Sequence, residues 1–177
     1  MTSELRVDRI IPVDGVAAND GSGGLIQTRF TQYYSGTLST TSTSFVDTGL
    51  HCSITPKSAN SLIHISVSAY YYFANNSDTN YAKATIYRDS TNLGDGDLGN
   101  NATQSSQTNN QNCLQWYQSG QPMANYNQGF SFEFVDRTHN STSQLTYKLY
   151  MSPHTAGTLY FGWNGQAKHM RLQEFSV

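Results

Sequence analysis

The sequence predicts an all-β protein: an antiparallel β-sandwich, with jelly-roll connections favoured and a plain immunoglobulin-type sandwich as the alternative. Apolar residues recur at every second position in several segments, which is the period of a half-buried strand. Aromatic residues make up 12% of the 177 residues and charged residues also only 12%, a balance that suits strands. Clusters of Gly, Asn and Pro separate the alternating segments, and no segment keeps a helical period.

Residues 1–24 precede the predicted strands and read as an N-terminal arm with a glycine-rich linker. A stretch this short cannot fold alone, and the glycines at 21, 23 and 24 form a flexible joint to the sandwich domain of residues 25–177. Charged residues between the apolar ones keep the arm soluble until a partner covers it. The predicted docking residues are the apolar ones: Leu5, Val7, Ile10, Ile11 and Val13.

The strongest strand signal covers residues 63–73, where one face is Ile, Ile, Val, Ala, Tyr and Phe and the other is His, Ser and Tyr. Clear alternation also predicts strands over residues 130–135, 145–151 and 159–163, with Phe132 at the centre of the core. Weaker candidates are residues 28–34, 44–47, 51–55, 82–88, 113–118 and 170–175. Eight to ten short strands in one domain of this size predict two packed sheets.

Tyr70 and Tyr72 fall on the face of the first of these strands that should point to water, and Tyr34 is expected to join them from another strand. A monomer usually carries charged residues at such positions. Aromatic surface on a second face therefore predicts a subunit interface.

Several motifs resemble a group of virion proteins of tailed phages, the cyanophage and marine-phage type. The arm reads LRVDRIIPVDG over residues 5–15 and GSGGLIQ over residues 21–27. The likeness continues over LSTTSTSFVDTGL (38–50), SITPKS (53–58), IYRDST (86–91), TYKL (146–149) and GTLYF (157–161), but not over residues 98–126. Members of this group are described as tail-fibre or as structural and decoration proteins. The resemblance implies a homotrimer in the virion, made in the cytoplasm of a bacterial host and bound to a capsid or tail protein.

Charge and hydropathy argue against nucleic acid and membrane as partners. The formal net charge is −2 with scattered Lys and Arg, so no basic patch is available for phosphates. No apolar run is long enough to span a bilayer, and the first residues carry no signal-peptide pattern, so we expect a protein kept in a cytosol. Cys52 and Cys113 are accordingly expected as reduced, unpaired thiols.

The sequence carries no recognisable catalytic or metal-binding motif. Its five histidines are far apart, and it contains no nucleophile elbow, P-loop or Cys-x-x-Cys pair. Asp95 and Asp97 lie near Asp89 and Asn92, but without the complete calcium-loop pattern a plain turn is favoured over a calcium site. We therefore predict no catalytic residue, no metal and no cofactor.

Residues 99–112 are rich in Asn, Gln, Ser and Thr and are followed by Trp116 and Tyr117. Amides beside aromatic rings suit carbohydrate binding, because sugar rings stack on aromatic faces and hydroxyls pair with amides. A solvated loop has the same composition.

Three functions follow from these observations. The first is a trimeric, non-enzymatic virion protein whose arm docks on the capsid exterior as a decoration or cement. The second is a tail-fibre or receptor-binding module, in which the arm attaches to the tail and Trp116 and Tyr117 meet a host glycan. A glycan depolymerase is disfavoured because no pair of acids suited to that chemistry is evident.

Overall fold

The computed structural model describes residues 24–34, 36, 38–74, 79–94, 114–119, 126–153, 157–162 and 165–177. The arm, with all five predicted docking residues, lies outside these residues, as does most of the amide-rich segment. The strands are β1 (Leu25–Tyr33), β2 (Leu38–Thr40), β3 (Val46–Ile54), β4 (Leu62–Ala74), β5 (Thr79–Arg88), β6 (Thr91–Asn92), β7 (Leu114–Ser119), β8 (Tyr126–Asp136), β9 (Leu145–Pro153), β10 (Thr158–Phe161) and β11 (Lys168–Phe175). The predicted all-β class is confirmed.

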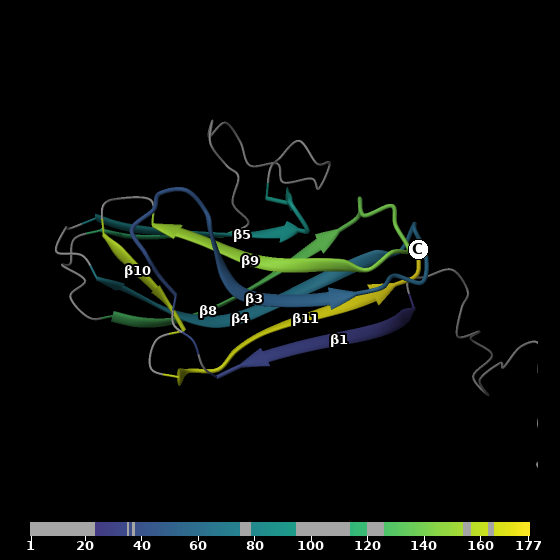
Figure 1. Cartoon of the computed structure of the whole chain (residues 1–177), viewed down its shortest axis with the longest axis horizontal. Helices are drawn as coiled ribbons and strands as arrows, with labels where there is room; N and C mark the ends of the chain where they lie inside the picture. The colour runs from purple at the N-terminus through teal and green to yellow at the C-terminus, as the bar shows by residue number, and fades with distance from the viewer. Residues whose placement is uncertain are drawn as a thin grey trace, which may run out of the picture.

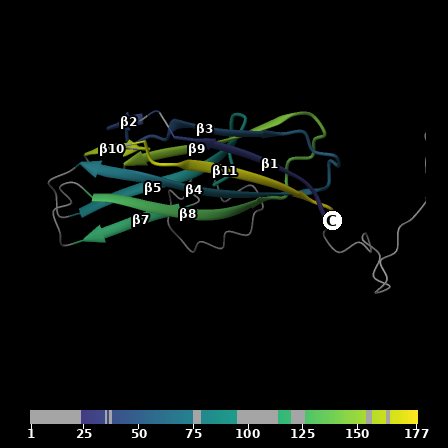
Figure 2. The same cartoon turned by 90° about the horizontal axis from the view of Figure 1, so that it is seen from below.

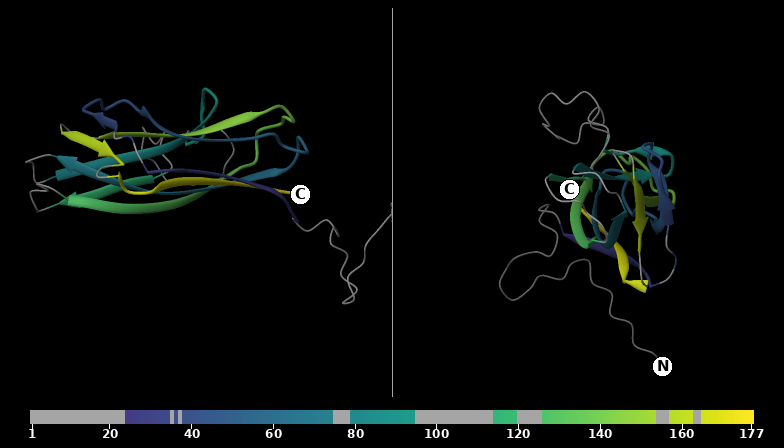
Figure 3. Two further views of the ribbon diagram at one scale, coloured as in Figure 1. Left: turned by 60° about the horizontal axis from the view of Figure 1, so that its bottom comes forward. Right: turned by 90° about the vertical axis from the view of Figure 1, so that its left-hand side faces the viewer.

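The strands form two antiparallel sheets packed face to face (Figures 1 and 3). Sheet A contains β1, β11, β4, β10, β2 and β8. β4 lies in its middle, with β8 along one side and β11 and β10 sharing the other. Sheet B contains β3, β9, β5, β6 and β7. In Figure 2 β1, β11, β4 and β8 run side by side along the molecule.

The order in which the eight long strands pair is that of a jelly roll. β5 pairs with β7, β4 with β8, β3 with β9 and β1 with β11. Each pair encloses the previous one in the sequence, and the pairs alternate between sheet B and sheet A. The chain therefore forms one long antiparallel hairpin that is folded into a two-sheet sandwich. The favoured topology is thus confirmed.

The core lies between the sheets and consists of one side of each strand. In β4 the residues at odd positions from Ile63 to Tyr71 are 4% exposed or less, and the intervening ones face outward. Sheet B contributes Leu50, Ile86 and Leu149, which are fully buried. Period-two alternation therefore predicted the inward face of this strand correctly.

Two predictions about strands were wrong. Residues 44–47 and 51–55 were expected as separate strands, but β3 runs through both, with a bulge between Asp47 and His51. Gly49 has φ of 77° there, which a Cβ-bearing residue rarely adopts, and its N–H donates to Asp47 at 2.8 Å. Phe132 is only partly buried against the core, because β8 is an edge strand with β4 as its one described neighbour.

Candidate functional site

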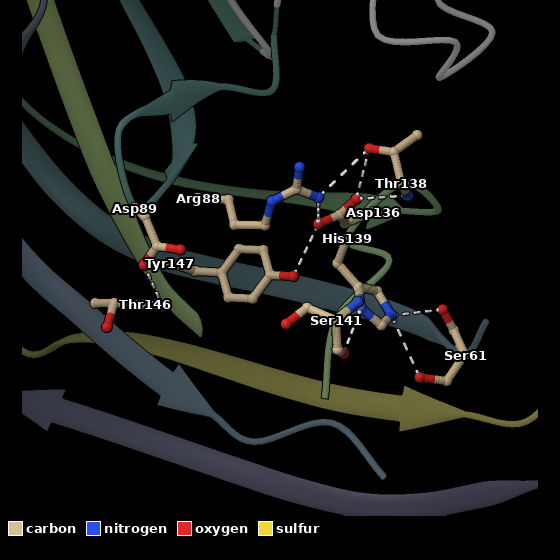
Figure 4. Close-up of polar contacts among 9 residues, drawn as sticks. All are labelled: Ser61, Arg88, Asp89, Asp136, Thr138, His139, Ser141, Thr146 and Tyr147. Carbon is tan, nitrogen blue, oxygen red and sulfur yellow. Dashed lines mark hydrogen bonds and ion pairs between the residues drawn. The ribbon is translucent and has the colours of Figure 1, made fainter. Parts of the chain in front are cut away.

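A buried polar cluster occupies the end of the sandwich where β5, β8 and β11 finish and β4 and β9 begin (Figure 4). Its members come from inward positions of the strands and from the loops that follow them. Asp136 continues the inward series of β8 and Glu174 that of β11, and both are 0% exposed. Two acids in a core need partners, and a serine and a histidine beside them are the residue types of a catalytic site.

Asp136 is held by three neighbouring side chains. Its Oδ2 accepts hydrogen bonds from Arg88 Nη1 at 2.7 Å and from Tyr147 Oη at 2.8 Å. Its Oδ1 accepts from the Thr138 N–H at 2.8 Å and from the Thr138 hydroxyl at 3.1 Å. Burial, followed by the negative charge of Asp136 and the hydrogen bond to it, raises the pKa of Tyr147 far above its usual value. The phenol therefore acts as a fixed donor and does not exchange a proton with substrate.

Glu174 is satisfied without a cationic partner. Its Oε1 accepts from the backbone N–H of Lys57 at 2.8 Å and of Ser58 at 3.2 Å, and from the Ser61 hydroxyl at 2.7 Å. Its Oε2 accepts from Gln27 Nε2 at 2.6 Å. Burial alone would raise the pKa of Glu174, but these donors outweigh it and lower the pKa.

Ser61 and His139 stand close together, with the Ser61 hydroxyl 3.3 Å from His139 Nε2. Nε2 lies closer to the Ser61 carbonyl, at 2.8 Å. His139 Nδ1 lies 3.1 Å from the Ser141 carbonyl oxygen and 3.3 Å from the Ser141 backbone nitrogen. Both ring nitrogens are therefore in contact with backbone groups. Ser61 is 2% exposed and donates to Glu174 or to the Ser58 carbonyl. Serine, histidine and acid are present, and their hydrogen bonds connect the ends of β4, β8 and β11 to one another and to the adjoining loops.

Asp89 and Asn92, the two residues near the possible calcium loop that the structure describes, form hydrogen bonds within and beside turns. Asp89 has φ of 54° after β5 and its Oδ1 accepts the Thr146 N–H at 3.0 Å. Asn92 Oδ1 accepts from the Thr85 hydroxyl at 2.5 Å and the Gly94 N–H at 3.0 Å. No group of metal-ligating side chains occurs within the described ranges. Asp95 and Asp97 lie outside them.

The outward face of sheet A is the second candidate site, and it is a surface. Among residues whose side chains the structure describes, the exposed large apolar ones that lie in strands all belong to β1 and β4: Leu25, Ile26, Phe30, Tyr33 and Tyr70. Tyr33 stands opposite the inward-facing Lys168 and so lies on the other side of β1 from Phe30. Phe30 is 55% exposed and packs its ring 5.6 Å from that of His169. The outward face of sheet B carries Asp47, His51 and Lys148, together with the stacked rings of Tyr87 and Tyr150, which are only partly exposed.

The three tyrosines predicted at an interface are placed as follows. Tyr70 is 38% exposed on the outward face of β4. Tyr72 lies two residues further along the same face, half-buried, with its ring 5.4 Å from that of Tyr160 on β10. Tyr34 follows β1 directly and is 63% exposed. Their role at an interface stays a prediction.

The structure describes only part of the predicted glycan-binding residues and cysteines. Trp116 and Tyr117 lie in β7, an edge strand of sheet B, but their side chains are not among those described. Cys52 is a buried free thiol whose pKa is raised by burial; Cys113 lies outside the described residues. No helix among the described residues is long and apolar enough to cross a membrane.

The sequence analysis missed the buried cluster altogether. Its members are spread from residue 27 to residue 174, so no local motif records them. The sequence nevertheless contains an indication of the cluster. Asp136 and Glu174 occupy positions that the apolar alternation of their strands predicts to be buried. An acid in phase with the core predicts a buried, hydrogen-bonded carboxylate.

Comparison with known proteins adds little to this geometry. No model of a protein family matches the chain, and no curated protein matches it either. Among solved structures, the CBM22-1 xylan-binding domain of Paenibacillus barcinonensis Xyn10C has 12% identity and a TM-score of 0.29, covering 88% of this chain and 97% of that one. A chain from the structure of infectious bursal disease virus Gx strain has the same identity and TM-score, covering 90% of this chain and 37% of that one. Likenesses this weak carry no argument about fold or function.

The fold and the surface together define a class: a jelly-roll sandwich with a hydrogen-bonded polar cluster at one end and several exposed large apolar side chains on one sheet.

Proposed function

We propose that this protein is a non-enzymatic structural protein of a phage virion, a homotrimer that its N-terminal arm docks on the capsid exterior as a decoration. One observation carries the non-catalytic, assembling part of the proposal. The buried acids, serine and histidine are committed to each other and to backbone groups, whereas large apolar side chains remain uncovered on sheet A. Such a surface is what a protein that functions by contact presents.

The arm supports the docking part, through the sequence and the resemblance. Gly24, the first described residue, is fixed to the sandwich because its carbonyl accepts the Ser176 N–H at 2.9 Å. The start of β1 therefore lies next to the C-terminus, at one end of the sandwich (Figure 1). Apolar anchors such as Ile10 and Ile11 would supply most of the binding free energy once buried.

Deleting residues 1–24 tests docking directly. We expect a folded oligomer that no longer joins particles when purified protein is mixed with virions lacking it and the pellet is analysed. Ile10→Asp with Ile11→Asp should approach the full deletion, while the matched control Arg6→Ala should weaken attachment only modestly. An arm-deleted protein that attaches as well as the intact one would place docking on the sandwich and refute the proposal.

A receptor-binding module of a tail fibre is the second candidate. It is favoured by the position of Trp116 and Tyr117 in β7, an edge strand at the border of the amide-rich segment. Replacing both by Ala should abolish retention on immobilised host polysaccharide if this function is correct. If the double variant is retained like the intact protein, or if the intact protein is not retained at all, the receptor-binding function is refuted.

A further inference from the structure

The pairing register of sheet A places one row of outward residues across four strands. Phe30 on β1 stands opposite Arg171 on β11, Arg171 opposite Ser66 on β4, and Ser66 opposite Glu133 on β8. The row thus runs from an exposed aromatic ring at one edge, through a cation, to an anion at the other edge. Cation and anion lie on opposite sides of β4.

These two residues are the only Lys, Arg, Asp or Glu at outward positions of β1, β4, β8, β10 and β11 whose side chains are described. Arg171 is exposed and forms no ion pair with a described residue. Glu133 is 65% exposed; one carboxylate oxygen lies 3.4 Å from His64 Nε2 and the other accepts from the Ser66 hydroxyl at 3.4 Å. Two strand spacings, about 10 Å, separate the backbones of Arg171 and Glu133. Both contacts of Glu133 are long and its side chain is mostly exposed, so its carboxylate, like Arg171, can be reached by a partner from outside the subunit.

Aromatic side chains lie on the same face as the two charges. Phe30 lies beside Arg171 at the β1 edge. Tyr70 lies further along β4, four residues beyond Ser66, with its ring over Gly129 of β8, where a Cβ would come within 3.1 Å of Tyr70 Cε1. Apolar area with few, opposite charges is the make-up of the buried part of a protein interface. Since the β1–β11 half of the face carries the cation and the β4–β8 half carries the anion, each half is complementary to the opposite half of another copy.

We propose that the outward face of sheet A is the surface through which this chain self-associates, with Arg171 of each copy paired with Glu133 of its neighbour. In a closed ring of three, each copy offers its β1–β11 side to one neighbour and its β4–β8 side to the other. This inference names the interface of the proposed homotrimer and rests on that self-association, but not on the arm or on the virion.

Charge reversal tests the pairing. Arg171→Glu and Glu133→Arg should each weaken self-association at least about tenfold in sedimentation at micromolar concentration and neutral pH, because like charges would then face each other. The two substitutions together should restore most of it. Lys148→Glu on the outward face of sheet B is the matched control and should leave assembly unchanged, and thermal unfolding checks that every variant folds.

Phe30→Ser gives a second measurement that does not depend on charge. It should also weaken assembly, with the domain still folded because the ring is more than half exposed. Single reversals that assemble like the intact protein, or a double variant no better than either single one, would overturn this interface while leaving the homotrimer standing. An intact chain that sediments as a monomer would overturn the homotrimer of the proposed function as well.

Discussion

Individual residues at the polar end of the sandwich show how a core can hold charge without catalytic use. Asp136 is paired with Arg88, and Tyr147 donates to the same oxygen. Removing one member of a buried pair leaves an uncompensated charge, which is more costly than the pair itself is stabilising. The cluster should therefore be sensitive to substitutions that barely change its shape.

Asp136→Asn should destabilise the domain by about 3–5 kcal/mol, because the amide leaves the partly buried Arg88 without its anion. Denaturant unfolding at pH 7 measures this. Asp89→Asn is the matched control in the same close-up (Figure 4): its side-chain oxygen can still accept the Thr146 N–H, and Asn tolerates the φ of 54°. Equal losses for the two variants would show that the Asp136 charge is unimportant.

Glu174 should make stability depend on acid pH. Its pKa is lowered in the folded protein from the usual 4.5, so the folded state favours the charged form. The resulting stabilisation is complete above the unfolded pKa and is lost as the pH falls through the lowered value. Glu174→Gln should cost about 1–3 kcal/mol near neutral pH and should flatten this acid dependence, measured by denaturant unfolding at several pH values. A variant as acid-sensitive as the intact protein would contradict this assignment.

At the scale of strands, the sequence predicted most of the elements because half-buried strands record their environment every second residue. β4, β8 and β9 were readable for this reason. β2 and β6 are three and two residues long, too short to show a period. β3 appeared as two strands because its bulge at Gly49 interrupts the alternation.

Alternation alone does not tell a central strand from an edge strand, as Phe132 shows. It predicts which side of β8 faces inward, but the depth of burial depends on neighbours supplied by distant parts of the chain. For the same reason, it placed Tyr70 and Tyr72 on an outward face without indicating which strands lie beside them. Strand order and the row through Arg171 and Glu133 came only with the pairing register.

Ile65→Ala and Phe132→Ala measure this difference between strands. Ile65 is 0% exposed in the central strand β4, so truncation should leave a cavity and cost about 2–5 kcal/mol. Phe132 stands opposite Val67, the next inward residue of β4, on the edge strand β8 and is only partly buried, so its loss should cost less, although the ring is larger. Denaturant unfolding of the two variants measures the loss of unfolding free energy for each, and we expect the larger loss for Ile65→Ala. A greater loss at Phe132 would mean that β8 is covered in the folded protein, as it would be in an oligomer too stable to dissociate before unfolding.

At the scale of the whole molecule, the functions proposed for the parts are spatially separate. The polar end fastens the strands next to Gly24, from which the arm departs. Sheet A presents the self-association face along the body of the sandwich, parallel to the strands (Figure 2). Docking and self-association can therefore operate together, and three copies would bring three arms to one partner. Linked arms attach more firmly than one arm alone because the later contacts form at high effective concentration.

This arrangement leads to a prediction about copy number. A decoration docks on a site that repeats over the whole capsid lattice, whereas a fibre module is confined to the tail, so the two functions differ in stoichiometry by a large factor. If the proposal is correct, purified virions should contain this protein in a fixed, high ratio to the major capsid protein, and quantitative mass spectrometry of intact and tail-stripped particles should give the same ratio.

The arm-deleted variant should be lost from both preparations, because attachment depends on the arm and not on the lattice alone. A ratio of only a few copies per particle, disappearing when tails are removed, would contradict decoration and favour the receptor-binding module.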